Sequence, residues 1–335
     1  MRTARPAETV GDERARFLTD LARVAGGPAI PLALAVSGGP DSMALLTLAA
    51  GALPGAVVAA TVDHGLRDGS ADESAMVARH CAALGVPHTI LTLDVRIEGS
   101  SLQARAREAR YAVLARWVGE VRAAALATAH HADDQAETFL MRAARGSGLA
   151  GLAGIRPCAT IAGVTVVRPL LGWRRAELRA IVRRAGAPFV DDPANADPRH
   201  DRTRFRNLLN ANEWLDPPNL ARAAAALAEA ESGMSALIAL LWTERAEMLA
   251  DRVRLQTDGI PRDALRRLAR RAIGVVRDQR GIVQPDWSDA VNIEPLLDAL
   301  AAGRRATQAG VLISPKDGIW TFRPAPPRRQ HGSAC

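Results

Sequence analysis

The strongest constraint on the fold is a regular alternation between short apolar runs and longer amphipathic stretches from residue 30 to residue 128. This order is typical of βαβ units, in which helices join the strands of a parallel sheet. The runs are IPLALAV at 30–36, AVVAATV at 56–62, HTILTL at 88–93 and AAALAT at 123–128, and helices are expected at 41–51, 70–84, 101–118 and 133–145. Right-handed crossovers place the carboxyl ends of these strands at one edge, so a ligand site is expected just after the runs.

The pattern changes after a further apolar piece at 164–171. A helix is expected at 174–185, then a polar stretch at 191–206, and Pro217-Pro218 marks a boundary before two expected helices at 219–250 and 261–277. We therefore expect an α/β chain: a parallel-sheet, Rossmann-like domain over residues 1–215, then a smaller, mostly helical domain over 216–335 with a disordered tail after Arg323.

Composition excludes several classes of protein. A length of 335 residues suggests two domains, and 48% hydrophobic with 24% charged residues excludes a wholly disordered chain. Cys81, Cys158 and Cys335 form no C-x-x-C pair, which argues against zinc ribbons, iron–sulfur clusters and disulfide scaffolds. No apolar run of membrane-spanning length is apparent, and the acidic amino terminus does not resemble a signal peptide. A cytoplasmic protein is expected.

The net charge of +7 is carried almost entirely by arginine, since Lys316 is the only lysine. Arginine suits bidentate phosphate contacts, although the abundance of alanine suggests that much of this bias is genomic. The excess is split almost evenly before and after residue 215. Any nucleic-acid surface is therefore expected to be a local patch.

The most specific motif follows the first apolar run and opens a predicted helix. It consists of Ser37, Gly38, Gly39, Pro40, Asp41 and Ser42. Two glycines permit a tight turn with exposed amides, while the serine hydroxyls and the helix amino terminus favour a phosphate. The motif lacks G-x-x-x-x-G-K-[ST], so transfer of a γ-phosphoryl group is not indicated. The plainer alternative is a glycine-rich turn with a Ser/Asp helix cap.

Two further strand ends carry polar residues. Asp63 and His64 follow the second run and are candidates for a nucleotide site, or only turn residues, whereas His88 begins a strand and is expected to be structural. After the fourth run, His131 precedes a helix on which Asp134 and Glu137 share a face. These three groups could bind Mg²⁺ or an ammonium group, or move a proton. An acidic first turn that only complements the helix dipole is the alternative.

The loop resembles the PP-loop pyrophosphatase family, whose S-G-G-x-D-S segment binds the departing pyrophosphate of ATP. The resemblance implies a PP-loop ATPase domain, attack on the α-phosphorus, and Mg²⁺ that stabilises the leaving pyrophosphate. It makes Asp41 a candidate metal ligand. It also places Asp63 and His64 near the adenosine.

Several segments taken together resemble the tRNA(Ile)-lysidine synthase family over roughly residues 30 to 210. They are VDHGLR at 62–67, REARYAVL at 107–114, HHADDQAETFLMRAARGSGLAGL at 130–152, RPLL at 168–171, and DDPAN with RFRN between 191 and 207. Asn210 lies where the family typically has another arginine. The carboxy-terminal domain matches loosely, through 310–322, and the extra module of longer family members is not evident.

The resemblance implies two reactions on the wobble cytidine of an isoleucine tRNA with a CAU anticodon. ATP adenylylates the cytosine C2 oxygen with release of pyrophosphate, and the ε-amine of free lysine then attacks C2 with release of AMP. Asp41, His131, Asp134 and Glu137 are the expected catalytic residues: Asp134 and Glu137 as lysine or metal contacts, and His131 near the reacting base. The expected metal ligands are Asp41 and Asp134.

The RNA must also be held, and arginines are the candidates for phosphate contacts. They are Arg105, Arg107, Arg110, Arg142, Arg145, Arg199, Arg202, Arg204 and Arg206, with Arg266, Arg267, Arg270 and Arg271 on the helix at 261–277. The like-charged pairs on that helix disfavour it unless an anion neutralises them. A solvated arginine face is the alternative.

Three other functions remain open. A tRNA thiolase usually needs paired cysteines, and an amidating ligase for a small molecule would not need the arginine-rich segments. A non-catalytic nucleotide-binding module would not need His131, Asp134 and Glu137 at one edge. The oligomeric state is left open, with a homodimer possible.

Overall fold

The computed structural model describes residues 10–27, 29–63, 70–93, 102–191, 201–288 and 291–326. The chain forms two compact units that divide between Glu229 and Ala230. The boundary proposed from sequence, after residue 215, lies just before helix α9 (Pro217–Arg245), whereas the division of the units falls within it. The expected disordered tail lies, from residue 327 onward, outside the described residues.

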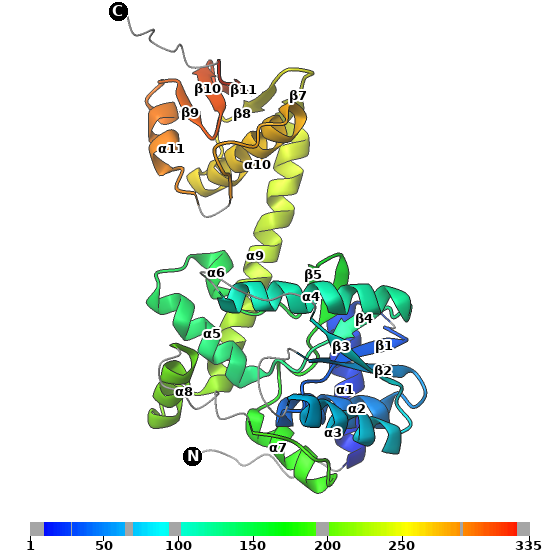
Figure 1. The fold of residues 1–335 in the computed structure, drawn as a ribbon. Helices are drawn as coiled ribbons and strands as arrows, with labels where there is room; N and C mark the ends of the chain where they lie inside the picture. Colours follow the sequence, from blue (N-terminus) through cyan, green and yellow to red (C-terminus); the bar gives the residue numbers. More distant parts are fainter. Residues whose placement is uncertain are drawn as a thin grey trace, which may run out of the picture. The chain divides into compact units, whose positions relative to one another are not determined.

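The first unit contains a six-stranded sheet and its helices (Figure 1). The strands are β1 Leu32–Ala35, β2 Val57–Asp63, β3 His88–Thr92, β4 Ala125–Ala127, β5 Cys158–Ile161 and β6 Val164–Val167. The helices are α1 Val10–Ala25, α2 Pro40–Ala52, α3 Ser70–Ala83, α4 Leu102–Glu120, α5 Ala132–Ala144, α6 Leu149–Leu152, α7 Arg175–Arg184 and α8 Asp201–Ala211, together with the first part of α9. The four predicted strands and the helices between them are confirmed.

The strand order is β3-β2-β1-β4-β6-β5, parallel except for β5, which pairs antiparallel with β6. In this register Leu34 of β1 lies beside Ala59 of β2 and Ala127 of β4. The carboxyl ends of β1, β2 and β4 therefore meet at one edge, where the sequence predicted a ligand site. Helix α8 was not predicted, because its residues were assigned to a polar stretch.

Helices cover both faces of this sheet. On one face α1, α2, α3 and α7 form a core with alternate strand residues such as Leu32 and Leu34. On the other face α4 packs Leu114 and Trp117 against Ala33 and Leu126. Because side chains alternate along a strand, a strand buried on both faces reads as a continuous apolar run, as these do.

Trp173 connects three segments that are distant in sequence. Its indole nitrogen donates to Asp20 at 2.9 Å, and the Arg16 guanidinium of α1 stacks 3.9 Å from the ring centroid. Its backbone carbonyl accepts from the amide of Ala132 at 2.8 Å. Because Ala132 opens α5, this buried tryptophan fixes where that helix begins.

The segment after α5 folds back on the helix through Gln135. Its side-chain oxygen accepts from the amide of Ile155 at 2.6 Å, and its nitrogen donates to the Ile155 carbonyl at 3.2 Å. Arg142 donates to the carbonyls of Gly151 and Gly154. Gly154 has a φ of 68°, and a Cβ there would lie 2.6 Å from the Gln135 oxygen. Glycine is thus required both for the turn and for the close approach.

The second unit combines helices with an antiparallel sheet of order β7-β8-β11-β10-β9. Its elements after α9 are β7 Ala246–Met248, β8 Val253–Gln256, α10 Arg262–Arg280, α11 Glu294–Ala301, β9 Ala306–Gln308, β10 Val311–Lys316 and β11 Ile319–Pro324. Leu268 and Ile273 of α10 are buried against Val311 and Phe322 of the hairpin. The helical character predicted for this region is confirmed, and the sheet is an addition to that prediction.

The sequence predicted no apolar run of membrane-spanning length, and helix α9 corrects this expectation. Among the described helices it is long and apolar enough, by length and composition, to cross a membrane. Its buried residues point to a different use: Ile238 and Trp242 belong to the core of the second unit, and Glu231 forms an ion pair with Arg267 of α10 at 2.7 Å. Length and composition alone are therefore weak evidence for a membrane span here.

We expect Gly154→Ala to destabilise the chain more than Gly163→Ala. Both glycines have positive φ, 68° and 82°, so a side chain at either costs about 1 kcal/mol or more in backbone strain. A Cβ at Gly163 has open space, whereas one at Gly154 must displace Gln135. Urea unfolding of both variants measures the difference, and equal losses would contradict the close approach.

Candidate active site

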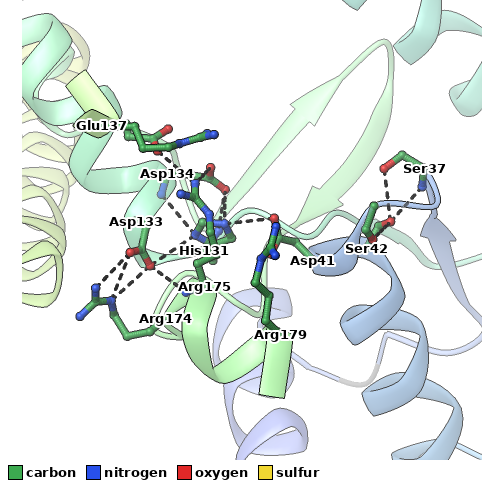
Figure 2. A network of polar contacts seen from close by, with 12 residues as sticks. Ser37, Asp41, Ser42, His131, Asp133, Asp134, Glu137, Arg174, Arg175 and Arg179 are labelled. Atoms are coloured by element: carbon green, nitrogen blue, oxygen red, sulfur yellow. Dashed lines mark hydrogen bonds and ion pairs between the residues drawn. The ribbon is translucent and has the colours of Figure 1, made fainter. Parts of the chain in front are cut away.

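The loop between β1 and α2 is fastened by its own serines (Figure 2). The Ser42 hydroxyl donates to the Gly39 carbonyl at 2.9 Å and accepts from the Ser37 amide at 3.1 Å. Gly38 has a φ of 83°, which a residue with a side chain rarely adopts. Gly39 is the N-cap of α2 and has no side chain to cap it, so the first-turn amides are available to an anion.

The amino terminus of α5 is closed by His131 and Asp134, which satisfy each other's backbone amides. His131 Nδ1 accepts from the Asp134 amide at 3.3 Å, and Asp134 Oδ2 accepts from the His131 amide at 3.0 Å. His131 Nε2 then lies 3.4 Å from Asp41 Oδ2 and 3.5 Å from Asp134 Oδ2. This is a capping box with a histidine at the N-cap, and it joins the loop to α5.

The protonation of this histidine follows from its neighbours. Because Nδ1 accepts a hydrogen bond, the proton of the neutral ring is on Nε2, between two carboxylates. Burial alone would lower the pKa of His131, but Asp134 and then Asp41 outweigh it, so the pKa is raised. Its neighbour His130 behaves oppositely: burial, with Arg168, Arg202 and Arg107, lowers its pKa to about 3 against the opposing effect of Asp134.

Arginines surround the carboxylates of α5. Glu137 is completely buried and accepts from Arg175 at 3.0 Å, Arg202 at 2.7 Å and Arg206 at 2.8 Å. Burial would raise the pKa of Glu137, and these guanidinium groups lower it below its ordinary value. A substrate ammonium could reach this carboxylate only by replacing an arginine.

Asp134 and Asp133 are also paired. Arg202 donates to Asp134 Oδ1 at 2.7 Å. Arg174 donates twice to Asp133, and the Arg175 amide donates to it at 2.8 Å. Arg174 and Arg175 were not among the site residues predicted from the sequence. The available signal was an Arg-Arg pair at the start of a helix that follows the sheet.

A cavity of about 310 Å³ opens beside the loop. Ser37 and Ser42 line one side, Asp134 and Arg202 another, and α4 contributes its Arg107, Arg110 and Tyr111. Ala35, Ala60, Val62 and Leu114 give it an apolar portion. An anion-binding loop, a carboxylate and an apolar surface in one cavity are suited to a nucleotide and a second, cationic reactant.

The remaining predicted residues are more dispersed. Asp63 ends β2 and accepts from the Ser70 hydroxyl, and it does not belong to the lining described above. Arg105 and Arg204 are exposed on α4 and α8, whereas Arg145 pairs with Asp201 at 2.8 Å. His64 and Arg199 lie outside the described residues. His88 is hydrogen-bonded to Thr61 at 2.9 Å, within the sheet, in agreement with its expected structural role.

Asp41 can contribute to a metal site. Its Oδ1 is buried and has no hydrogen-bond partner within the described part of the chain. No group of three or more His, Cys, Asp or Glu side chains there has the arrangement of a metal centre. Mg²⁺ is commonly held by one or two carboxylates together with substrate phosphates, so a single free carboxylate oxygen beside a phosphate loop fits it. Both oxygens of Asp134 already have partners.

The like-charged arginine pairs of α10 were expected to need an anion, and the structure shows partners for them within the protein. Arg266 pairs with Glu294 and Asp263, and Arg267 pairs with Glu231 and Asp263. Arg270 and Arg271 lie over the rings of Trp287 and Trp242. Carboxylates of the same unit thus neutralise one arginine of each like-charged pair, so Arg266 and Arg267 need no external anion, while Arg270 and Arg271 contact aromatic rings.

The chain is similar to known proteins along most of its length. A family model described as a PP-loop domain matches residues 14–213. The tRNA(Ile)-lysidine synthase of Zymomonas mobilis is 42% identical over 304 residues, which cover 89% of this chain and 90% of the relative. That of Novosphingobium aromaticivorans is also 42% identical, over 325 residues that cover 96% and 97%.

Among solved structures, the U34-tRNA thiolase NcsA from Methanococcus maripaludis matches with a TM-score of 0.54 at 18% identity, over 66% of this chain and 80% of that chain. At this identity the match supports the fold alone. The relatives of nearly equal length and the PP-loop match over most of the first unit are decisive: the chain belongs to the tRNA(Ile)-lysidine synthase family, within the PP-loop proteins.

Proposed function

We propose that the protein uses ATP to join free lysine to C2 of the wobble cytidine in the isoleucine tRNA with a CAU anticodon, through an adenylylated cytidine. The carrying observation is that Asp41, His131 and Asp134 connect the phosphate loop to α5 beside one cavity. The relatives that are named tRNA(Ile)-lysidine synthase support the isoleucine tRNA and lysine as substrates. Such a reaction belongs in the cytoplasm.

In the first reaction the cytosine C2 oxygen attacks the α-phosphorus of ATP, and pyrophosphate leaves. The loop amides and the amino terminus of α2 bind the pyrophosphate, whose developing charge they stabilise. Asp41, whose Oδ1 has no hydrogen-bond partner among the described residues, would help to hold Mg²⁺, which would neutralise phosphate charge. Asp63 and His64 are proposed near the adenosine.

In the second reaction the lysine ε-amine attacks C2, and AMP leaves. An ammonium group is not nucleophilic, so the amine must be held and deprotonated before attack. Asp134, which lines the cavity, is proposed as its contact or as a second metal ligand. His131 is 1% exposed, and its Nε2 lies 3.4 Å from Asp41 and 3.5 Å from Asp134, so it is proposed to position these two carboxylates near the reacting base.

Glu137 has a different proposed role from Asp134. The Glu137 carboxylate already accepts hydrogen bonds from three guanidinium groups, so its proposed role is to position Arg175, Arg202 and Arg206. Arg105, Arg107, Arg110, Arg145, Arg204 and Arg206 are proposed to contact tRNA. Of these, Arg145 and Arg206 are also engaged in ion pairs within the first unit.

Sulfur transfer is not favoured by the cysteines. Cys81 is buried in the core, and burial raises the pKa of its thiol to about 11. Cys158 is exposed on β5, and neither of these two forms a disulfide. A catalytic thiol normally has a lowered pKa, so Cys81 is unsuited to this role.

Asp134→Asn should abolish the lysine step while leaving part of the adenylylation. The amide cannot balance an ammonium charge, so lysine transfer is expected to fall about 100-fold or more. Lysine incorporation into a CAU-anticodon transcript, measured beside pyrophosphate release without lysine, separates the steps. Asp133→Asn is the matched control, because Asp133 lies on the same turn but faces Arg174. Unchanged lysine transfer in Asp134→Asn would remove the role proposed for Asp134.

The stability contributed by His131 should decline above neutral pH. Its pKa in the folded chain exceeds the unfolded value of about 6.5, so the contribution is full below that pH and is lost as pH rises through the folded pKa. We expect the difference in unfolding free energy between the wild type and His131→Asn to shrink from pH 6 to pH 9. Urea titrations at each pH measure it, and a difference that grows with pH contradicts the raised pKa.

Arg204→Ala should weaken tRNA binding and reduce its salt dependence. Arg204 is exposed on α8, and loss of one phosphate contact is expected to lower the slope of log K against log salt by about 1. Arg266→Ala is the control, since carboxylates of its own unit already neutralise Arg266. Filter binding across a salt series gives both slopes. Equal slopes for the two variants would rule out the Arg204 contact.

A further inference from the structure

Tyr111 is the single tyrosine of the chain. Its polar hydroxyl lies in an otherwise apolar core. The side chain is only 3% exposed and packs with Leu114 and Trp117 on the face of the sheet covered by α4. Its hydroxyl is buried and has no hydrogen-bond partner among the described residues. An unpartnered buried hydroxyl costs about 1–3 kcal/mol, so phenylalanine would serve better if packing were its only purpose.

The surroundings of Tyr111 indicate what the missing partner is. Tyr111 lines the cavity of about 310 Å³, as do Arg107 and Arg110. The guanidinium carbons of these arginines lie 4.9 and 5.6 Å from the centroid of the tyrosine ring. Neither arginine has a carboxylate partner among residues 10–27, 29–63, 70–93, 105–191, 201–288 and 291–326, in contrast to Arg174, Arg175 and Arg202.

The positive charges of Arg107 and Arg110 also repel each other. Burial lowers the pKa of the Arg110 guanidinium, the Tyr111 phenol counteracts this, and Arg107 lowers it further. Arginines three apart on a helix repel, and an anion between them would relieve the repulsion. A hydroxyl donor with two adjacent guanidinium groups is a donor set suited to phosphate oxygens.

We propose that the Tyr111 hydroxyl, together with Arg107 and Arg110, binds a phosphate-ester oxyanion in this cavity. The inference rests on the proposed function, which brings two such esters to the cavity: the α-phosphate of the nucleotide and a phosphodiester beside the wobble cytidine. In either case the phenol donates its hydrogen bond to a phosphate oxygen, and the guanidinium groups balance the charge. Tyr111 is then a binding residue that the two flanking arginines assist.

Tyr111→Phe tests the hydroxyl alone, because the ring and its packing remain. We expect about tenfold weaker binding of one ligand, either a non-hydrolysable ATP analogue or a CAU anticodon stem-loop RNA, each titrated separately without the other. The arm that weakens identifies the source of the phosphate. Arg107→Gln should weaken binding in the same arm. Arg116→Gln is the control, since Arg116 is exposed on the same helix and does not line the cavity.

A spectroscopic measurement removes the dependence on affinity. With one tyrosine in the chain, 3-fluorotyrosine gives a single ¹⁹F resonance at position 111. It should shift with the ligand whose binding Tyr111→Phe weakens. Unchanged affinity for both ligands with an unmoved resonance would overturn the proposal, as would a response to lysine alone.

Failure of the proposed function and failure of the phosphate site give different experimental results. A wild-type protein that adds no lysine to the transcript, yet shows the ¹⁹F shift with the ATP analogue and its loss of affinity in Tyr111→Phe, would contradict lysidine formation and retain the phosphate site. Lysine transfer by the wild type without any phosphate-dependent response at Tyr111 would do the reverse.

Discussion

The site depends on the neutralisation of three carboxylates that one helix carries into a poorly solvated region. Asp133, Asp134 and Glu137 lie within the first turns of α5, where like charges would repel each other and resist burial. Arg174 and Arg175 at the start of α7 (Figure 2) and Arg202 of α8 supply the compensation. Removing these arginines together would leave the carboxylate charges buried without compensation. The docking of α7 and α8 against α5 is therefore as much an electrostatic requirement as a matter of apolar packing.

Features that depend on neighbouring residues could be predicted from the sequence, whereas contacts between distant residues could not. The strands, the helices between them and the loop at Ser37–Ser42 follow from local patterns and from the rule that parallel strands end at one edge. The capping of α5 by His131 and the pairing of Glu137 with Arg206 could not be predicted in this way. The second of these joins residues that are 69 positions apart, and no local period records such a contact.

The two arginine-rich helices show why a like-charge rule fails without tertiary structure. On α10 the pairs suggested an external anion, yet Glu294 from α11 and Glu231 from α9 supply the charge. On α4, Arg107 and Arg110 are three residues apart and lie against one aromatic ring. Sequence spacing identifies a repulsion, but only the folded chain shows whether the protein or a ligand resolves it.

The pKa values of two neighbouring histidines are shifted in opposite directions within one short segment. His130 and His131 are both largely buried, but carboxylates face the second, whereas arginines outweigh the one carboxylate near the first. His130, which borders the cavity, thus has a lowered pKa, whereas Asp134 and Asp41 raise the pKa of the adjacent His131. With Arg202 on Asp134, the cluster is balanced before any substrate enters. A lysine ammonium bound at Asp134, as proposed, would compete with the Arg202 guanidinium, so its occupancy would depend on where α8 lies.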